Sequence, residues 1–528
     1  TYIRVSKTLC DGETKAIQKR KIKIQKALSD LKISCESDCV PPIAVLGSGG
    51  GGLRAMVALM GTLTELGAQN LLDTIMYLCG VSGSTWCMTS LYHNQTWSSD
   101  VEKAETEMVQ RLTTGSFNLQ KALARIIEAE KDENFFFTDV FATTVVHGIV
   151  KQVDEAFLSK KTDDEMNNPY PIFAVVDKEQ RQKDEHNKGV WFEITRHEAG
   201  YSGYGAFVET PFFGSRFSGG NVEEPKYEMD MLYLQGLCGS CFADLPYILG
   251  IVLNYYRVLF LQLYLCSINL QSQFSFILQL LGPQHYQAEM LTTVPLLFDI
   301  KLQNLYIAAL ISAFNETLKE EAKTFVKNKT IQDCLNKLID LLFDWIWGTK
   351  HNFLYKYPEY ENTLPDYLLN NEKIYLEDAG FAINCGYPLV LRPDRGVQLI
   401  LSFDFGIADP FETVTKAAKY CEKNNIPFPP IPPVSEEEKN CPSSCYIFPG
   451  ENTPTVMHFP LFNKDSCESN NEKIEELKNI YRTAKGIYSE EEVDDLLEVA
   501  KNNVRKNKDK IITGMQNAVE AERKKKKQ

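Results

Sequence analysis

The chain has 528 residues, 44% of them hydrophobic, so it can bury a sizeable core as one large domain or as a core with a cap. Its fourteen cysteines are scattered, and the close pairs lack the neighbouring histidines or second pair of a zinc site. No metal or other cofactor is therefore predicted, and the formal net charge of −14 gives no reason to expect a nucleic acid partner.

Residues 1–40 are predicted to contain one amphipathic helix. The opening Thr1-Tyr-Ile-Arg-Val lacks the pattern of a signal peptide, which favours reduced thiols and a cytoplasmic location. From Glu13 to Ile33, apolar residues recur on one helical face among lysines; they are Ile17, Ile24, Leu28 and Leu31. This helix could pack on the core or lie on a membrane surface.

A strand, a glycine nest and a helix follow between residues 43 and 63. Ile43 to Leu46 is apolar and leads into Gly47-Ser-Gly-Gly-Gly-Gly52. After the glycines, apolar residues spaced by three and four predict a helix with one buried face; they are Leu53, Met56, Val57, Met60 and Leu63. The unpaired N–H groups and positive dipole end at the start of this helix suit an anion.

Three kinds of anion site could be formed by this glycine nest. A P-loop needs a Lys-Ser/Thr pair after the glycines, but Leu53-Arg54 stands there. A dinucleotide fold needs an acidic residue at the end of the second strand, whereas Asp73 precedes that strand. An oxyanion hole formed by the N–H groups of Gly51 and Gly52 needs no further motif and is favoured.

The segment Gly80-Val-Ser-Gly-Ser84 is typical of a nucleophile elbow. An apolar strand over residues 74–79 precedes it, and a helix over residues 85–92 can follow it. Ser82 is therefore the predicted nucleophile. An ordinary glycine-serine turn is the alternative, because Ser84 occupies the position where the usual motif has its last glycine.

The region from about 244 to 345 is rich in aromatic and aliphatic residues. The stretch Leu245 to Leu270 is long enough to raise the question of a membrane span, but Asn254, Arg257 and Gln262 interrupt it. A cap of amphipathic helices near the mouth of the site is predicted, and a buried helical layer is the alternative.

A serine nucleophile needs a base within hydrogen-bonding reach. Asp378 stands at the end of an apolar strand and shortly before a glycine, where a loop could present it at the edge of the sheet. His458, within Val456-Met-His-Phe-Pro460, would instead complete the Ser, Asp, His order of a hydrolase triad. Spacing alone leaves the choice between a dyad and a triad open.

Residues 466–528 are predicted to form a helical, basic carboxyl-terminal segment. Ser489 and Glu492 make a capping box, and one apolar face follows, with Val493, Leu496, Leu497, Ala500 and Val504. From residue 501 to 528 there are ten Lys/Arg and three Asp/Glu. Such a tail would attract anionic lipid headgroups, and a solvated, frayed helix is the alternative.

These elements predict an α/β fold with a three-layer core over residues 41–465, in which helices cover both faces of a central mixed sheet. Ser82 and Asp378 would meet at strand ends. The predicted strands lie near 43–46, 74–79, 170–177, 190–196, 374–378 and 397–405.

Several segments carry a resemblance to a known family. The main ones are the glycine nest with Leu53-Arg-Ala55, Gly80 to Trp86, Asp378-Ala-Gly380, and Tyr387 to Pro393. Further ones are Tyr170–Ala174, Trp191–Thr195, Phe213–Phe217, Trp347–Tyr355, Ser402–Phe405, Ile426–Pro429 and Met457–Pro460. Together they resemble the cytosolic (group IV) phospholipase A2 family, whose core is shared with the patatin-like lipases.

The resemblance implies a Ser–Asp dyad without histidine, with Ser82 as nucleophile and Asp378 as the base. It also implies that Gly51 and Gly52 form the oxyanion hole. Arg54 is implied as a partner of the substrate phosphate, a role that suits the planar guanidinium fork. Arg395 matches a second family arginine linked to activity and is predicted to contact the phosphate as well.

The chain departs from the family pattern in several places. It has four consecutive glycines where three are usual; because Arg54 keeps its spacing to Ser82, the extra one is placed before Gly51. Cys238 stands where relatives carry tryptophan. A prenylation motif is missing after Lys524, and the residues before Ser82 are too few for a C2 domain, so calcium dependence is not implied.

The implied reaction is hydrolysis of a fatty acyl ester, mainly at the sn-2 position, of membrane glycerophospholipids through an acyl-serine intermediate. Lysophospholipase and transacylase activity would accompany it. The implied partners are lysophospholipids, glycerophospholipids and the surface of intracellular membranes, to which the protein would bind peripherally. The alternatives are a catalytically silent lipid-binding protein on the same fold and a Ser-Asp-His esterase that uses His458.

Overall fold

The computed structural model describes residues 2–129, 137–160, 167–240, 347–358, 364–467, 470–483 and 485–527. The chain divides into two compact units. The first comprises Thr1–Asn118, Thr138–Asp244 and Trp347–Gln528 and contains every predicted site residue. The second comprises Leu119–Phe137 and Leu245–Ile346, of which the helix α5 (Leu119–Ala129) and Phe137 are described. The predicted cap-like region over 244–345 lies outside the described residues.

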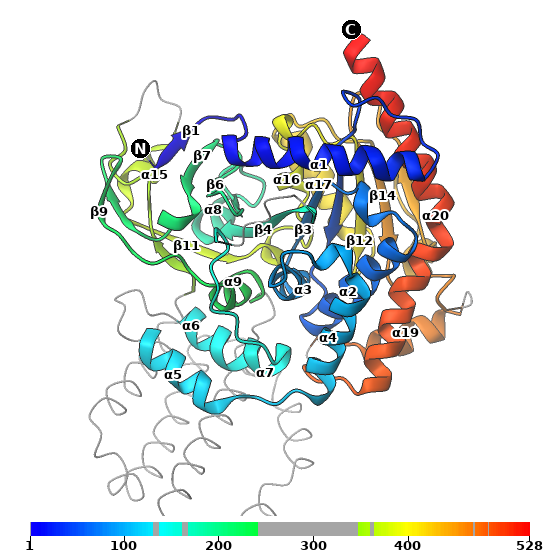
Figure 1. Cartoon of the computed structure of the whole chain (residues 1–528), viewed down its shortest axis with the longest axis horizontal. Coiled ribbons are helices and arrows are strands. Elements are labelled where there is room, and N and C mark those ends of the chain that lie inside the picture. Colours follow the sequence, from blue (N-terminus) through cyan, green and yellow to red (C-terminus); the bar gives the residue numbers. More distant parts are fainter. Residues whose placement is uncertain are drawn as a thin grey trace, which may run out of the picture. The chain divides into compact units, whose positions relative to one another are not determined.

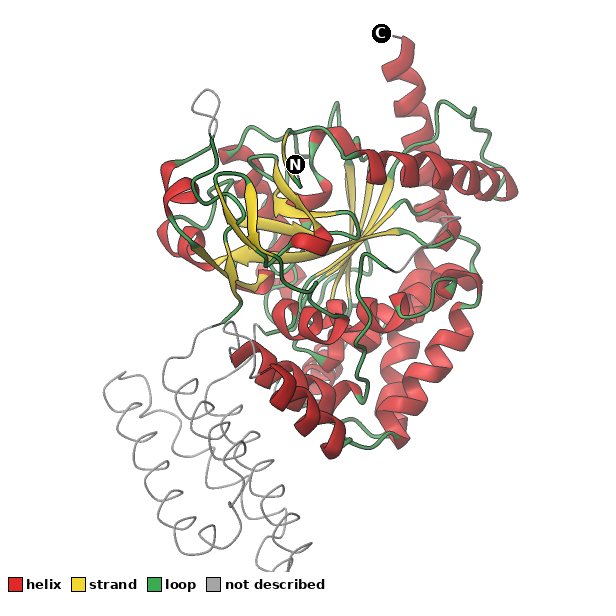
Figure 2. Cartoon of the chain, turned by 60° about the vertical axis from the view of Figure 1, so that its left-hand side comes forward, coloured by secondary structure: helices red, strands yellow, loops and turns green. Residues whose placement is uncertain are grey.

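The first unit is built around one large mixed sheet, which Figures 1 and 2 show as a twisted fan of strands. In its described part the neighbouring strands follow the order β1-β7-β6-β5-β4-β3-β2-β12-β14-β13, β11 pairs with both β10 and β4, and β8 and β9 form a separate ribbon. The strands are β1 (Ile3–Val5), β2 (Ile43–Gly47), β3 (Tyr77–Gly80), β4 (Tyr170–Asp177), β5 (Trp191–Ile194), β6 (Glu198–Tyr201), β7 (Ala206–Glu209), β8 (Arg216–Ser218), β9 (Asn221–Glu224), β10 (Thr349–His351), β11 (Lys373–Asp378), β12 (Leu399–Asp404), β13 (Tyr446–Phe448) and β14 (Thr455–Pro460).

The middle of the sheet is parallel. Strands β4, β3, β2, β12 and β14 run in one direction, and every further strand of this sheet is added through an antiparallel pairing with its neighbour. Every residue of β2, β3, β4 and β12 is buried, which explains their unbroken apolar sequences, because a parallel sheet is covered on both faces. The predicted α/β core with a central mixed sheet is confirmed.

The six predicted strands correspond to β2, β3, β4, β5, β11 and β12. The largest difference in a boundary is at β3, which begins at Tyr77, because Leu72–Thr74 forms a 3-10 turn in which the Thr74 side chain donates to the carbonyl of Leu71. The strands β6, β7 and β14 extend the sheet beyond the predicted set.

Helices cover both faces of the sheet (Figure 2). On one face α2 packs against α20, α3 and α4, and on the other α16 packs against α17 and β5. The helices of the first unit are α1 (Asp11–Asp30), α2 (Leu53–Ala68), α3 (Gly83–Tyr92), α4 (Val101–Thr114), α6 (Phe137–Phe141), α7 (His147–Val150), α8 (Lys178–Lys183), α9 (Met231–Cys238), α15 (Asp366–Asn370), α16 (Tyr387–Val390), α17 (Glu412–Lys423), α18 (Glu436–Asn440), α19 (Asn471–Ile480) and α20 (Glu490–Lys527). None of the helices described in either unit has the length and apolar content that a bilayer crossing requires.

The two predicted amphipathic helices both pack on the core. In α1 the predicted apolar face is buried at Ile17, Ile24 and Leu28, and in α20 the whole predicted face from Val493 to Val504 is buried. The capping box of α20 is present: the Glu492 N–H donates to Ser489 Oγ at 3.2 Å, and the Ser489 N–H donates to the Glu492 carboxylate at 3.0 Å.

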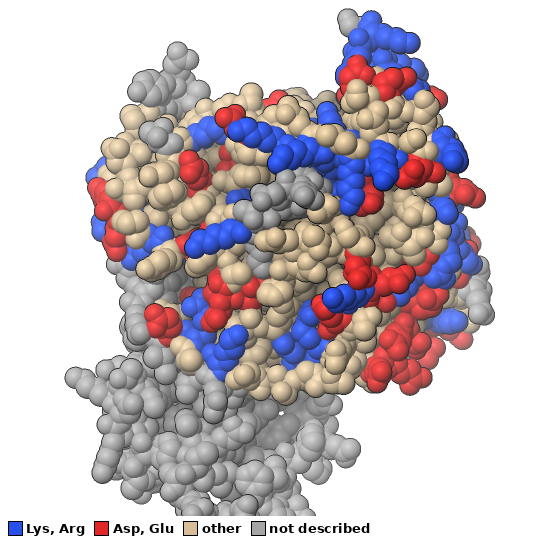
Figure 3. All heavy atoms as spheres, in the orientation of Figure 1, with Lys and Arg blue, Asp and Glu red and all other residues tan. Residues whose placement is uncertain are grey.

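The basic residues of these two helices lie at the amino-terminal edge of the parallel strands. Figure 3 shows Lys and Arg side chains in a row over α1 and at the end of α20. Arg20 of α1 donates to the carbonyl of Ile75, just before β3, at 2.7 Å. Arg523 pairs with Glu36, just before β2, at 2.8 Å. Because the site residues follow the carboxyl ends of these strands, the basic surface lies at the opposite edge.

Candidate active site

Ser82 stands in the tight turn between β3 and α3. Its backbone has φ 54° and ψ −123°, which a residue with a side chain rarely adopts, and it is almost fully buried. Gly83 is required next to it, because a Cβ there would lie 2.0 Å from the carbonyl oxygen of Gly52. The strained strand-to-helix turn that the motif predicts is therefore present.

The glycine nest lies directly beside this turn. Gly51 and Gly52 have φ 76° and 65°, and α2 begins at the next residue. Within the described residues, neither of their N–H groups donates a hydrogen bond, so both are available to an anion. The loop with the extra glycine is closely packed: a Cβ on Gly50 would lie 2.4 Å from the carbonyl oxygen of Phe405.

Asp378 reaches the same place from the opposite direction. One edge of β4 pairs with β5 along its length, at Phe173 as well as at Val175. On the other edge of β4, Phe173 pairs with Gly80 of β3. Two residues further along that edge, Val175 pairs with Asp378 of β11. Strands β3 and β11 therefore lie in line on one edge of β4, and their carboxyl ends meet. The two pairing positions are about 7 Å apart along β4. Ser82 follows Gly80 by two residues, so the fold brings it to Asp378.

The Asp378 side chain is fully buried, and its Oδ1 accepts a hydrogen bond from the N–H of Gly380 at 2.8 Å. The neighbouring helix α9 carries Cys238, whose thiol is also buried. Burial and the nearby charge of Asp378 both raise the pKa of this thiol, so it stays neutral beside the carboxylate. The Cys238 side chain thus lies near the predicted base.

Arg54 lies in the first turn of α2 and is buried. Its Nε donates to the carbonyl of Phe405 at 2.8 Å and its Nη1 to the carbonyl of Tyr481 at 2.5 Å. Burial without a carboxylate partner lowers the pKa of the guanidinium to about 10, which still leaves it charged at neutral pH. In the part of the chain that the structure describes, Nη2 makes no hydrogen bond, so one amino group is left for a ligand.

Arg395 is placed differently from its prediction. All five of its N–H donors are used: Nε and Nη2 contact Glu13, Nη1 and Nη2 contact Glu193, and Nη1 also donates to the carbonyl of Leu389. This geometry argues against the predicted phosphate contact, because no donor remains for a substrate.

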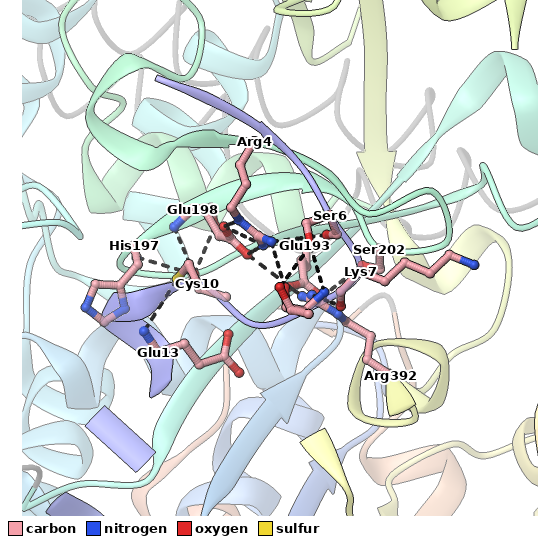
Figure 4. Close-up of polar contacts among 12 residues, drawn as sticks. Arg4, Ser6, Lys7, Cys10, Glu13, Glu193, His197, Glu198, Ser202 and Arg392 are labelled. Atoms are coloured by element: carbon pink, nitrogen blue, oxygen red, sulfur yellow. Dashed lines mark hydrogen bonds and ion pairs between the residues drawn. The ribbon is translucent and has the colours of Figure 1, made fainter. Parts of the chain in front are cut away.

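The group around Arg395 is an ion cluster in which Glu13, Glu193 and Glu198 pair with Arg4, Arg392 and Arg395. Figure 4 shows Arg4 beside Glu198 and Arg392 beside Glu193. The three carboxylates lie close enough to one another to hold a metal ion, but three guanidinium groups already balance their charge. Although burial alone would raise it, Arg392 and Arg395 lower the pKa of Glu193 to about 2. The cluster ties the amino-terminal segment to the sheet.

His458 lies too far from Ser82 to serve it. The strand pairings give the separation: His458 of β14 pairs with Ser402 of β12, and Ser402 pairs with Leu46 of β2. Leu46 in turn pairs with Cys79 of β3, the strand that leads to Ser82. Three strand spacings amount to about 14 Å, more than an imidazole can span. The ring is buried, which lowers its pKa, and its Nε2 lies 2.6 Å from the carbonyl oxygen of Pro410. The arrangement argues against the triad that uses this histidine.

Some residues at the site were not predicted from the sequence. Asn384 contacts the nest at Gly49, and Thr483 lies where a Cβ on Gly51 would point. The Ser84 side chain donates to the carbonyl of Ser48 at 2.7 Å and so joins the elbow to the nest. A role for Ser84 could have been predicted, because it is the last residue of the elbow motif. Nothing in the sequence links Asn384 or Thr483 to residues more than three hundred positions away.

Comparisons with known proteins show which family the chain resembles. A family model described as "Lysophospholipase catalytic domain" matches residues 43–248. Cytosolic phospholipase A2 gamma of Mus musculus is 36% identical over 568 residues, which cover 96% of this chain and 91% of the mouse protein. The gamma protein of Homo sapiens is also 36% identical, over 96% of this chain and 94% of its own.

A solved structure shows the same fold. Human GIVD cytosolic phospholipase A2 superposes with a TM-score of 0.70 at 22% sequence identity, over 98% of this chain and 68% of that chain. Together with more than a third identity along nearly the whole length of two relatives, this confirms the resemblance seen in the sequence. The chain belongs to the cytosolic phospholipase A2 family.

Proposed function

We propose that this protein hydrolyses fatty acyl esters of membrane glycerophospholipids, mainly at the sn-2 position, with Ser82 as nucleophile and Asp378 as its base. The observation that carries the proposal is the meeting of β3 and β11 on one edge of β4, because each strand delivers one of these two residues. The names of the relatives support phospholipids as substrates, and the family description supports lysophospholipids as well.

In the acylation step, Asp378 accepts the hydroxyl proton of Ser82 while Oγ attacks the ester carbonyl carbon. The resulting alkoxide is stabilised by the N–H groups of Gly51 and Gly52, which have no other acceptor among the described residues. When the ester C–O bond breaks, Asp378 returns the proton to the departing lysophospholipid. Water then attacks the acyl-serine, or a lipid hydroxyl does so and the acyl group is transferred.

Arg54 is the proposed partner of the substrate phosphate. Its Nε and Nη1 are fixed by two backbone carbonyls, which holds the guanidinium plane still while Nη2 stays available. Because Arg54 begins the helix that the nest introduces, a phosphate on Nη2 would lie near the ester bound at Gly51 and Gly52. We do not extend this role to Arg395.

No step of this mechanism uses a divalent cation, since the backbone donors and Arg54 stabilise the negative charges, so we propose activity without calcium. The protein would act from the cytoplasm by peripheral contact with an intracellular membrane. That contact involves the edge where the parallel strands end, because a phospholipid must enter the site from there.

The test is acyl release from defined phospholipid vesicles, with and without a chelator. Ser82→Ala and Asp378→Ala are each expected to lower kcat by about 10⁴-fold or more, with no effect of the chelator on the wild type. Ser90→Ala, a serine on the same helix α3, is the matched control and should retain activity. A wild type that binds vesicles without releasing acyl groups would favour the silent lipid-binding protein, and loss in only one of the two variants would overturn the dyad.

A further inference from the structure

Asn384 joins the glycine nest to the loop that carries Asp378. It lies six residues after Asp378, between β11 and α16. Two hydrogen bonds connect it with Gly49: the Gly49 N–H donates to the Asn384 carbonyl at 3.0 Å, and the Asn384 Nδ2 donates to the Gly49 carbonyl at 2.6 Å. The residue that begins the run of glycines is thus held at both of its backbone groups by one asparagine.

The same side chain adjoins the nucleophile. A Cβ placed on Gly49 would lie 2.1 Å from Asn384 Oδ1 and 2.9 Å from the Cβ of Ser82, so the amide and the serine side chain meet at one point beside Gly49. Oδ1 is a buried acceptor without a hydrogen bond among the described residues. An acceptor left unpaired in this position is available to a hydroxyl, and that of Ser82 is the neighbouring one.

We propose that Asn384 is a positioning residue for the reaction, which keeps the nest, Ser82 and Asp378 in their mutual register. This inference rests on the proposed function. Asn384 itself does not contact the reacting bond; it acts through the Gly49 backbone and through the loop that it shares with Asp378.

The physical reason is the freedom of the nest. Consecutive glycines have few steric limits on their backbone, whereas an oxyanion hole stabilises charge only when its donors are held in place. The Ser48 and Gly49 carbonyls are fixed by the side chains of Ser84 and Asn384, respectively. The loss of one oxyanion donor typically lowers kcat by about 10²–10³-fold, and a displaced nest would misplace both donors.

An asparagine suits this position because the Gly49 carbonyl needs a donor of fixed direction. Alanine would remove the shorter of the two hydrogen bonds to that carbonyl and leave only the one from the Ser48 hydroxyl, at 3.0 Å. Aspartate, which has the same shape, would place a negative oxygen where the amide nitrogen stands. A protonated aspartate would again offer a donor. The two substitutions therefore separate loss of the hydrogen bond from loss of packing.

The experiment compares wild type, Asn384→Ala and Asn384→Asp in phospholipid hydrolysis and in the rate of Ser82 labelling by a fluorophosphonate. We expect kcat and the labelling rate of Asn384→Ala to fall by about 10²-fold, with KM within about threefold of the wild type. For Asn384→Asp, the ratio of its kcat to that of the wild type should rise as the pH falls from about 8 to about 5.

Asn424→Ala is the matched control, because Asn424 is also half-buried and donates from Nδ2 to two backbone carbonyls, at 2.8 Å each, but lies at the end of α17. It should lose thermal stability and keep kcat within about twofold. A folded Asn384→Ala protein with wild-type kcat would overturn the proposal, and so would a ratio for Asn384→Asp that does not change with pH. If Asn384→Ala does not fold, the pH dependence of the kcat ratio of the isosteric Asn384→Asp to the wild type tests the proposal by itself. A wild type that is neither labelled nor active would instead contradict the proposed function.

Discussion

At the scale of single residues, the site combines strain with close burial. Ser82 keeps a positive φ because Gly83 packs on the Gly52 carbonyl and Ser84 binds the Ser48 carbonyl, so contacts on both sides fix the turn. The backbone of the turn therefore fixes the direction of the Ser82 side chain. The same contacts hold the nest, in which the N–H groups of Gly51 and Gly52 make no hydrogen bond with any described residue.

Arg54→Lys tests the phosphate contact. A lysine has a single amino group and cannot contact the two backbone carbonyls and the phosphate as the three guanidinium nitrogens do. We therefore expect kcat/KM for phospholipids to fall by about 10–100-fold, which corresponds to about 1.4–2.8 kcal/mol. Hydrolysis of an ester without a phosphate, measured on the same preparation, should change by no more than about threefold. Equal losses on both substrates would show that Arg54 only supports the fold through Phe405 and Tyr481.

Glu193→Gln tests the buried ion cluster. The folded pKa of Glu193 is about 2, below its unfolded value, so the carboxylate stabilises the fold at neutral pH and this contribution is lost as the pH falls toward 2. The difference in unfolding free energy between wild type and Glu193→Gln should therefore shrink by about 2 kcal/mol from about pH 6 to about pH 3. Urea unfolding at a series of pH values measures this difference.

Glu475→Gln is the control for that series, because the Glu475 side chain is 64% exposed and pairs with Lys478 on the surface of α19. Its effect should stay below about 0.5 kcal/mol at every pH. If the Glu193→Gln difference were independent of pH, the carboxylate would not be held ionised by Arg392 and Arg395.

The individual residues show what the sequence can and cannot predict. Ser82 and Asp378 could be proposed from the sequence because each belongs to a short motif. The ion pairs of Arg395 could not be predicted, since its partners Glu13 and Glu193 lie far away in the chain and give no local signal. Asn384 escaped notice for the same reason, because its contact with Gly49 exists only after β2 and β11 have taken their places in the sheet.

At the scale of elements, the branching of the sheet at β4 creates the site. Strand β3 pairs with one edge of β4 and ends at Gly80. Beyond that point, β11 pairs with the same edge of β4 and runs in the opposite direction. The sequence predicted both strands but could not predict this junction, because pairing partners are chosen by long-range packing. It did predict the apolar faces of α1 and α20, whose periodicity is a local property.

Ser489→Ala tests the start of α20. The Ser489 side chain accepts the N–H of Glu492, and this cap should be worth about 1 kcal/mol of unfolding free energy. Thr513→Ala on the same helix is the control: Thr513 lies in the helix interior and bonds only the Asp509 carbonyl, so alanine should be neutral or slightly stabilising. Equal destabilisation by both changes would mean that the capping box does not matter.

At the scale of the whole first unit, two edges of the sheet have different characters. The amino-terminal edge carries the basic residues of α1 and of the end of α20 (Figures 1 and 3). The carboxyl edge carries Ser82, Asp378 and the nest. From the sequence, the basic tail was predicted either to attract anionic lipid or to be a solvated, frayed helix. Its position, with Lys526 paired to Asp38 at 3.3 Å, places it away from the site.

Neutralising Lys524, Lys525 and Lys527 together to glutamine tests this placement. Because these side chains lie at the edge opposite the nucleophile, hydrolysis of vesicles with anionic lipid should stay within about twofold of the wild type at physiological ionic strength. Vesicle co-sedimentation measured alongside should change little. A drop in activity that parallels a drop in binding would show that the tail holds the enzyme on the membrane.

The central claim, that Ser82 acts with Asp378 and without a histidine, is tested most directly by mapping a fluorophosphonate adduct by mass spectrometry. We expect the adduct on Ser82 in the wild type and in His458→Ala, and a labelling rate lower by about 10³-fold or more in Asp378→Asn. An adduct on another serine, or a folded His458→Ala protein that no longer reacts while Asp378→Asn still does, would contradict the account.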